Sequence, residues 1–363
     1  MALSAGILYS NACPLLKEKK ITLTQEDTLH FHAPCFDGLI SAVVASDYLE
    51  TAQDWNIQKY LPMTYNLDEA WLQERLPQRS AIVDFLYHPD ATFWVDHHMT
   101  TFLDENKDNT SGAARKNYEL ALKSDLNRTL IYDKTAKSGA GLLWKHVQNF
   151  VSDKQRYAEM IAWAEKTDSA SYDTPEQAVY GEDYALRIAH GLGTRIPGNE
   201  EFLKTILQEL RHKTLQEVAA LPLIYDRFIE RRTKIEEGME ILRKNARVTD
   251  DGIGFYEVTL NANQEIPRFG LFLEKPEIRY SLTLIHGPNS SKISASRNPW
   301  GEMNIASLGD IFRNHGGGGH HSVGSTIIPK EIGIEKAKES FKQIFLDITS
   351  AEKTKKSENS RGR

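Results

Sequence analysis

The sequence has 363 residues, of which 40% are hydrophobic and 26% charged, and this composition excludes collagen-like, low-complexity and wholly disordered chains. At roughly 150 residues per domain, the length predicts about two domains. The net charge of −6 argues against a protein that coats long nucleic acid and favours a small phosphorylated substrate or a short oligonucleotide end. Two cysteines are too few for a disulfide framework, and no apolar run is long enough to span a membrane. We therefore expect a cytoplasmic protein without a signal peptide or a membrane partner.

The first half of the chain has the pattern of an α/β domain. Residues 1–24 are expected to form an irregular N-terminal extension. Residues 25–195 alternate short apolar runs with amphipathic runs, which predicts a parallel sheet with flanking helices. The clearest elements are a helix over 38–49 and strands over 28–32, 80–85 and 92–96. We expect Phe85, Phe93 and Trp94 in the core of this sheet.

The second half begins with a helical segment. Apolar residues recur at helical spacing through 196–248, which predicts a helical connector that could also form a homodimer contact. Residues 249–348 are expected to form a smaller mixed α/β domain with a closing helix over 334–348. Its clearest strand patterns cover 254–260, 280–285 and 292–296. The polar, basic residues 349–363 are expected to form a disordered tail.

Acidic and imidazole side chains follow several of the predicted strands and one predicted helix. They are His32, Asp37, Asp84, Asp96, His97, His98 and Asp168. Strand ends that are far apart in sequence converge at the carboxyl edge of an open parallel sheet. This donor set suits divalent ions of the Mn, Fe or Zn type, and a carboxylate between two ions is a common arrangement for activating water against phosphorus. By contrast, His30, His146 and His190 are expected to be structural.

Two further motifs suggest ligand contacts. Four glycines at 316–319 allow a backbone to approach a ligand closely and to present N–H groups to an anion. Arg297 carries a planar fork that suits phosphate. Ser138 precedes a predicted helix, and we favour a capping role for it over a phosphate site at the helix N-terminus.

The spaced motifs together resemble one known superfamily. V-D-H-H at 95–98 follows I-V-D-F at 82–85 and H-x-x-C-x-D-G at 32–38, and this set is similar to the DHH phosphoesterases. G-G-G-G-H-H-S-V-G-S at 316–325, preceded by S-A-S-R-N at 294–298, resembles the DHH-associated C-terminal domain of the first type. Within this superfamily, the chain resembles the nano-RNases, or oligoribonuclease-like enzymes. The resemblance implies a two-domain fold, with a five-stranded parallel sheet first, and a two-metal centre that usually holds manganese.

The resemblance also implies roles for individual residues. His32 would hold the first ion, Asp84 would bridge both ions, and Asp37, His97 and Asp168 would hold the second. Asp96 would orient the site, and His98 would face the substrate, where it binds phosphate or protonates the leaving oxygen. The C-terminal domain would bind the substrate through the residues Arg297, Gly317, Gly318, Gly319 and His320. His321 is not required by the motif.

Cys35 departs from the commoner first motif of that superfamily, H-x-x-x-D-x-D. The spacing is one residue shorter, and a cysteine stands where the first aspartate would fall. A thiolate ligand here would shift the metal preference from manganese toward zinc or iron. Alternatively, Cys35 is a small buried residue and the first ion is held weakly or not at all. On the sequence alone we favour the second interpretation, because cysteine in a short turn is often a packing residue.

The sequence therefore predicts a metal-dependent phosphoesterase that acts on small nucleotides. By resemblance, the candidate substrates are short oligoribonucleotides, 3′-phosphoadenosine 5′-phosphate and cyclic dinucleotides. One alternative is an inorganic pyrophosphatase-like hydrolase, although those proteins carry a different C-terminal domain. Another is a catalytically degenerate nucleotide-binding protein, in which Cys35 has disabled one ion site.

Overall fold

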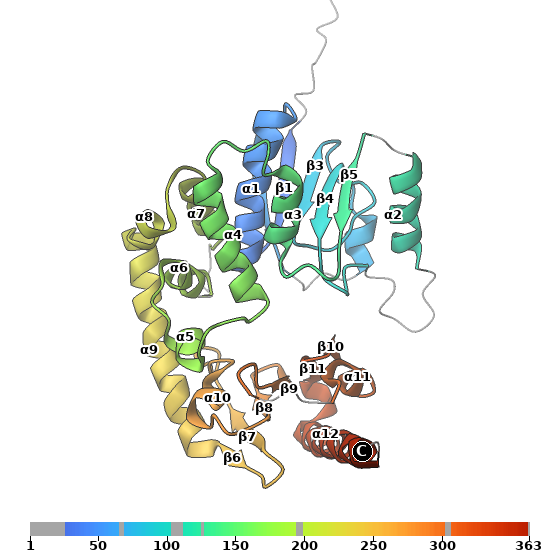
Figure 1. Ribbon diagram of the computed structural model, residues 1–363, viewed down its shortest axis with the longest axis vertical. Coiled ribbons are helices and arrows are strands. Elements are labelled where there is room, and N and C mark those ends of the chain that lie inside the picture. The colour runs from blue at the N-terminus through green and yellow to red at the C-terminus, as the bar shows by residue number, and fades with distance from the viewer. Residues whose placement is uncertain are drawn as a thin grey trace, which may run out of the picture.

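The computed structural model describes residues 26–64, 69–102, 112–124, 127–193, 199–301 and 306–361. Two α/β domains lie one above the other in Figure 1, the first with a five-stranded sheet and the second with a six-stranded sheet. The predicted fold class is confirmed. The expected N-terminal extension lies outside the described residues. None of the helices in the described ranges is long and apolar enough to cross a membrane.

The first sheet is parallel throughout, in the order β2-β1-β3-β4-β5. Its strands are β1 (Asp27–His32), β2 (Ile57–Met63), β3 (Ser80–Val83), β4 (Phe93–Asp96) and β5 (Thr129–Tyr132). Every residue of β3 and β4 is buried, as expected for a sheet covered on both faces. The chain passes from β1 to β2 on one side and returns to β3 on the other side of β1. The carboxyl ends of β1 and β3 therefore form a topological switch point, where open α/β sheets bind ligands.

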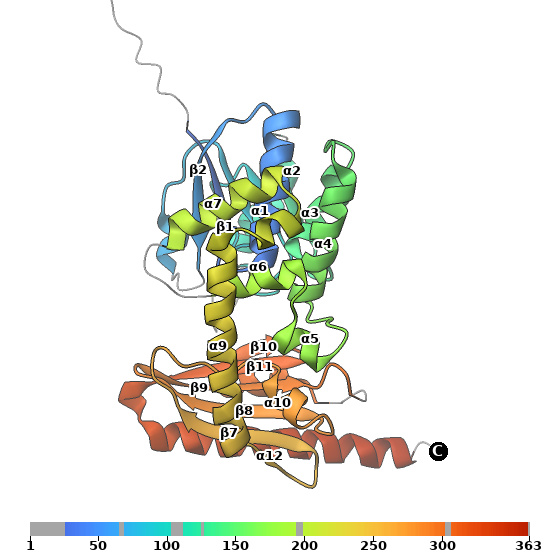
Figure 2. The ribbon, with the colours of Figure 1, turned by 90° about the vertical axis from the view of Figure 1, so that its left-hand side faces the viewer.

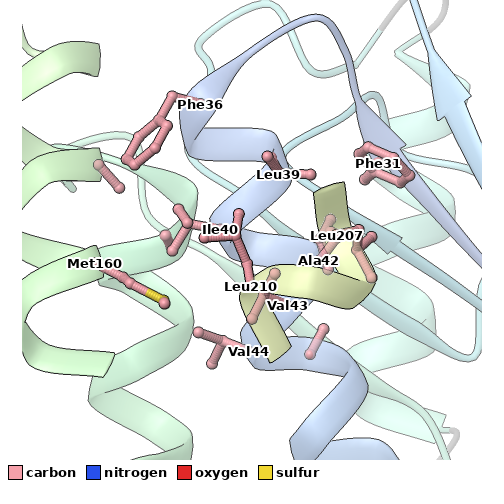
Figure 3. Packing of buried hydrophobic residues seen from close by; sticks show 14 of the residues in the cluster. Phe31, Phe36, Leu39, Ile40, Ala42, Val43, Val44, Met160, Leu207 and Leu210 are labelled. Carbon is pink, nitrogen blue, oxygen red and sulfur yellow. The ribbon is translucent and has the colours of Figure 1, made fainter. Parts of the chain in front are cut away.

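Helices cover both faces of this sheet. One face packs against α1 (Phe36–Ala52), α3 (Gly139–Val147) and α4 (Lys154–Asp168), and the other against α2 (Ala113–Ser124) and η1 (Glu69–Gln73). Helix α1 is apolar around most of its circumference and is surrounded by other elements. Figure 3 shows Ile40 and Val44 of α1 facing Met160 of α4, with Leu207 and Leu210 of α7 on another side. The predicted core positions of Phe85, Phe93 and Trp94 are confirmed.

The predicted connector is helical, but most of it belongs to the first domain. The helices that follow α4 are α5 (Pro175–Tyr180), α6 (Tyr184–Leu192), α7 (Asn199–His212), α8 (Leu215–Ala219) and α9 (Pro222–Asn245). Apolar side chains of α7 and α8 are buried in the same core as α1. Helix α9 then runs from the first domain to the second, as Figure 2 shows. Within the predicted connector over 196–248, the apolar faces of α7 and α8 thus pack against the first domain.

The second sheet is mixed, in the order β10-β11-β9-β8-β7-β6, with one parallel pair, β7 and β8. Its strands are β6 (Arg247–Val248), β7 (Ile253–Thr259), β8 (Tyr280–His286), β9 (Ser290–Arg297), β10 (Gly318–His320) and β11 (Val323–Pro329). Its other elements are α10 (Gly270–Glu274), α11 (Leu308–Arg313), η3 (Lys330–Ile332) and α12 (Ile334–Arg361). Helices α11 and α12 bury the apolar face of the sheet.

Helix α12 extends beyond the predicted closing helix. It continues past residue 348 to Arg361, through the stretch for which the sequence predicts a disordered tail. The reason lies in the packing of Glu352, which is buried and accepts hydrogen bonds from the hydroxyl of Tyr280 and from the backbone N–H of Ala306. Arg279 pairs with the same carboxylate. The polar composition of this segment therefore gives no sign of the buried contacts through which Glu352 holds it to the second domain.

Candidate metal centre

The predicted ligands converge at the carboxyl edge of the first sheet. His32 ends β1, Asp84 follows β3, and Asp96 ends β4 and precedes His97. Donor atoms lie within 4.8 Å of one another in three overlapping groups. These groups are His32 with Cys35 and Asp84; Asp37 with His97 and Asp168; and Asp84 with Asp96, His97 and His98. The structure thus brings together all the side chains that sequence reasoning assigned to a metal centre and to its catalytic residues.

Asp84 lies between the first two groups. It is fully buried, and its Oδ2 lies 3.4 Å from Nδ1 of His32 while its Oδ1 lies 3.5 Å from Nε2 of His97. Its backbone has a φ of 54°, in the left-handed region that is costly for a residue with a side chain. Such strain concentrates at functional sites, where the surrounding structure holds it. Asp84 is therefore placed to contact an ion in either group.

The N-terminus of α3 fixes the carboxylate of Asp37. The backbone N–H of Gly139 donates to Oδ2 at 2.7 Å, and that of Ala140 donates to Oδ1 at 2.9 Å. Ser138 caps the helix by accepting from the N–H of Gly141, which confirms its predicted role. The first backbone N–H groups of α3 therefore bind the carboxylate of Asp37, which lies 102 residues earlier in the sequence. Nothing in the sequence indicated this pairing.

His97 is oriented so that one ring nitrogen points into the cluster. Its Nδ1 lies 3.2 Å from the carbonyl oxygen of Ala136, and because a carbonyl only accepts, Nδ1 carries the proton. Its Nε2 lies 3.3 Å from Oδ2 of Asp168, 3.7 Å from Oδ2 of Asp37 and 3.5 Å from Oδ1 of Asp84. A histidine whose second nitrogen is held by a carbonyl is a typical metal ligand.

Asp96 holds the two histidines that follow it. Its Oδ1 accepts from the backbone N–H of His97 at 2.8 Å and from Nδ1 of His98 at 2.8 Å. The side chain of His98 is about one-fifth exposed, whereas Asp96 is buried. Burial opposes protonation of His98, but Asp96 and the carboxylates of Asp84 and Asp168 outweigh it and raise its pKa to about 9. His98 can therefore present a proton to a bound molecule.

The electrostatics of the cluster fit divalent cations. Burial raises the pKa of Asp37 well above its usual range, and burial together with Asp84 raises the pKa of Asp168. Within the described ranges, no lysine or arginine forms an ion pair with these carboxylates or with Asp84 and Asp96. The buried atoms Oδ1 of Asp84, Oδ2 of Asp96 and Nε2 of His97 also lack a hydrogen-bond partner there. Buried unpaired charges are costly, and cations at this position would compensate them.

Two adjoining cavities lie on the second domain, and the first of them also contacts the end of α4. The first, of about 250 Å³, begins at Ser169, next to Asp168, and is lined across the domain boundary by Arg268 and Arg297. The second, of about 480 Å³, lies on the face of the second sheet opposite α12 and shares Arg268 and Ser296 with the first. The cavities therefore form one groove. Sequence reasoning missed Arg268, because it lies in a segment without a motif and reaches the groove only through the fold.

The side chain of Arg297 lines the groove, and its guanidinium also makes hydrogen bonds within the second domain. Its Nη2 donates to the carbonyl oxygen of Ala306 at 2.6 Å and lies 2.7 Å from Nε2 of His321. The motif did not require His321, yet its ring is the partner that positions this guanidinium.

The glycine motif has a structural role of its own. A Cβ on Gly317 would lie 2.2 Å from the carbonyl oxygen of Ser325, and one on Gly319 would lie 2.1 Å from that of Val323. Gly319 also has a φ of 149°. The close pairing of β10 with β11 thus requires these glycines, whereas a Cβ on Gly318 would meet open space. The side chain of His320 lies outside the described part of the chain.

Comparisons with known proteins support the fold. No family model and no curated protein matches the sequence. The chain is similar to the pGpG-specific phosphodiesterase PggH from Vibrio cholerae, with a TM-score of 0.62 and 18% identity over 89% of this chain and 100% of that chain. The DHH domain of a protein assigned to a family of ribosomal proteins aligns with a TM-score of 0.54 and 16% identity, over 89% of this chain and 87% of that chain.

A third solved structure is RecJ from Thermus thermophilus in complex with Mn²⁺. Its TM-score is 0.50 and its identity 13%, over 90% of this chain and 51% of RecJ, so this chain spans about half of RecJ. These likenesses show that the chain has the two-domain fold of DHH proteins.

Proposed function

We propose that this chain is a metal-dependent phosphoesterase of the DHH superfamily that hydrolyses small nucleotides. The observation that carries the proposal is the position of Asp84, which is buried between two donor groups at the carboxyl edge of the first sheet. The similarity to a pGpG-specific phosphodiesterase and to RecJ in complex with Mn²⁺ is consistent with this chemistry.

The residues of the cluster divide into ligands and groups that act on the substrate. His32, Asp84 and Cys35 would hold one ion, and Asp37, His97 and Asp168, with Asp84, would hold the other. Divalent ions bound there, Mn²⁺ among them, supply water activation and neutralise charge on a phosphate. His98 is oriented by the hydrogen bond from its Nδ1 to Asp96, so it would donate a proton to the leaving oxygen or a hydrogen bond to the phosphate.

The groove supports a substrate of nucleotide size. Its cation nearest the cluster is Arg268, whose guanidinium lines both cavities and suits a phosphate. The floor of the second cavity is the open face of the sheet, and it carries hydroxyl groups suited to ribose and base edges. They belong to Ser281, Thr283, Ser294, Ser296 and Ser325.

The length of the groove favours a substrate with more than one nucleotide. It follows β9 from Arg297 to Lys292, which lines the far end. At about 3.3 Å per residue, this span is about 17 Å. A short 5′-phosphorylated oligoribonucleotide would therefore place its cleaved phosphate at the ions and its remaining phosphate toward Lys292.

The proposal is tested by product release from purified protein. A 5′-phosphorylated diribonucleotide, 3′-phosphoadenosine 5′-phosphate and a cyclic dinucleotide are each incubated with metal-stripped protein, with and without added Mn²⁺. We expect Mn²⁺-dependent hydrolysis of at least one of them, its loss in Asp84→Ala, and its retention in Asp133→Ala, which removes an exposed carboxylate outside the cluster. Binding of these nucleotides without turnover would support a degenerate nucleotide-binding protein. Hydrolysis of inorganic pyrophosphate alone would support the pyrophosphatase alternative.

A further inference from the structure

We propose that Cys35 is a thiolate ligand and that the two ion positions of this centre therefore prefer different metals. The position formed by His32, Cys35 and Asp84 would take a thiophilic ion such as Zn²⁺ or Fe²⁺. The position formed by Asp37, His97 and Asp168 would take a harder ion such as Mn²⁺ or Mg²⁺. The inference rests on the proposed metal-dependent function for the presence of ions, but it is tested by metal binding and not by turnover.

The geometry places the sulfur among metal donors. Sγ of Cys35, a ring nitrogen of His32 and a carboxylate oxygen of Asp84 all lie within 4.8 Å of one another. The three residues come from separate elements, since His32 ends β1, Cys35 precedes α1 and Asp84 follows β3. One ion at the centre of such a triangle would reach a nitrogen, a sulfur and an oxygen ligand.

The side chain of Cys35 is not a conventional helix cap. Cys35 is the N-cap residue of α1, where serine, threonine, asparagine or aspartate would cap the helix, yet its side chain makes no capping hydrogen bond. Its neighbours Ala33 and Phe36 are buried in the core of the first domain, whereas Cys35 is half-buried. A role as a metal ligand is compatible with this position.

A second observation concerns Asp84, the carboxylate of this triangle. It is fully buried, its Oδ2 lies 3.4 Å from Nδ1 of His32, and its Oδ1, 3.5 Å from Nε2 of His97, has no hydrogen-bond partner among the described residues, so a cation bound to this carboxylate would compensate its charge. A metal ion binds cysteine as the thiolate, so sulfur ligation at this position would accompany ion binding.

The two donor sets differ in softness. Thiolate and imidazole select zinc, iron and cobalt, whereas a position dominated by carboxylates accepts manganese and magnesium. Binding of the ion at the first position forms a sulfur–metal bond and releases the thiol proton to solvent. No electron transfer and no additional reactant is required.

Cobalt substitution tests the sulfur–metal bond directly. Metal-stripped protein is titrated with Co²⁺, and the near-ultraviolet absorption from sulfur-to-cobalt charge transfer is recorded. Cys13→Ser serves as the matched control, because Cys13 is the one other cysteine in the sequence. We expect the band in the wild type and in Cys13→Ser, and its loss in Cys35→Ser. An undiminished band in Cys35→Ser, or cobalt binding without any band in the wild type, would overturn the inference.

Metal competition provides a second test with another variant. Zn²⁺ binds more tightly than Mn²⁺ at most nitrogen and oxygen sites, so the informative quantity is the change in their affinity ratio between proteins. We expect Cys35→Asp to lower the Zn²⁺-to-Mn²⁺ affinity ratio at least tenfold at one position and to leave the other unchanged. An unchanged ratio at both positions would contradict the inference. A protein that shows the cobalt band but hydrolyses no nucleotide would retain this inference and lose the proposed function.

Discussion

Replacement of Gly139 by alanine separates the stability of the fold from the geometry of the proposed centre. Gly139 begins α3, and a Cβ at this position would lie 3.0 Å from Oδ1 and 3.1 Å from the Cβ of Asp84. These approaches are tighter than ordinary van der Waals contact, and Asp84 is fully buried, so its carboxylate must move by a few tenths of an ångström. Misplacement by about 1 Å costs about 100-fold in rate, so we expect about a tenfold loss of metal-dependent hydrolysis.

Gly141→Ala is the matched control for this variant. Gly141 lies in the same turn of α3, and its added Cβ would lie 2.5 Å from Oε1 of Glu165, the end of a flexible side chain, and 3.0 Å from Oγ of Ser138, but it would not meet Asp84. Both added Cβ atoms approach their neighbours closely, so each variant is compared with its own metal-free unfolding temperature. Thermal unfolding is measured with and without Mn²⁺, because an ion that binds only the folded state raises this temperature. We expect a smaller Mn²⁺-induced rise in Gly139→Ala than in Gly141→Ala. Equal rises and equal hydrolysis rates in the two variants would refute the reasoning.

Three further predictions address other parts of the molecule. Burial, with Arg231 and Arg232 nearby, lowers the pKa of His190 from 6.5 to about 4, so below pH 6.5 the unfolded chain binds a proton that the folded chain does not. The free energy of unfolding, measured by urea denaturation, should therefore fall between pH 7 and pH 4.5. We expect this fall to be about 2 to 3 kcal/mol larger in the wild type than in His190→Leu, and falls of equal size would contradict the prediction. Arg268→Gln should raise KM about tenfold with little change in the unfolding temperature, because it removes one charged contact to substrate; an unchanged KM in steady-state kinetics would exclude that contact. Glu352→Ala should lower the free energy of unfolding by about 2 to 3 kcal/mol, whereas Glu339→Ala, at an exposed position of the same helix, should lower it by less than about 0.5 kcal/mol. Equal urea midpoints for the two variants would show that the end of α12 does not depend on Glu352.

The ligand positions could be predicted because they follow from local patterns. Asp84 and Asp96 come directly after short apolar runs, and such runs are buried parallel strands whose carboxyl ends meet. The structure confirms both the parallel sheet and the convergence of these side chains with His32. In this part of the chain, the regular geometry of the parallel sheet brings the carboxyl ends of the strands together, so the sequence alone indicates which side chains meet.

Other features depend on contacts between distant segments and could not be predicted in this way. The carboxylate of Asp37 binds the N-terminus of α3, and no residue near either segment encodes that pairing. Arg268 enters the groove only because the second domain faces the end of α4. The end of α12 looks like a tail in composition, and its order depends on the contacts of Glu352 with the sheet. Each of these features is set by tertiary packing and not by local sequence preference.

Metal stoichiometry tests most directly whether Asp84 would hold ions in both donor groups. Wild-type protein and Asp84→Ala are equilibrated with Mn²⁺ or with Mn²⁺ and Zn²⁺, dialysed, and analysed for bound metal. The account predicts about two ions per wild-type chain and the loss of both in Asp84→Ala, because both donor groups depend on the same carboxylate. Full occupancy in Asp84→Ala, or the loss of one ion alone, would contradict a bridging role.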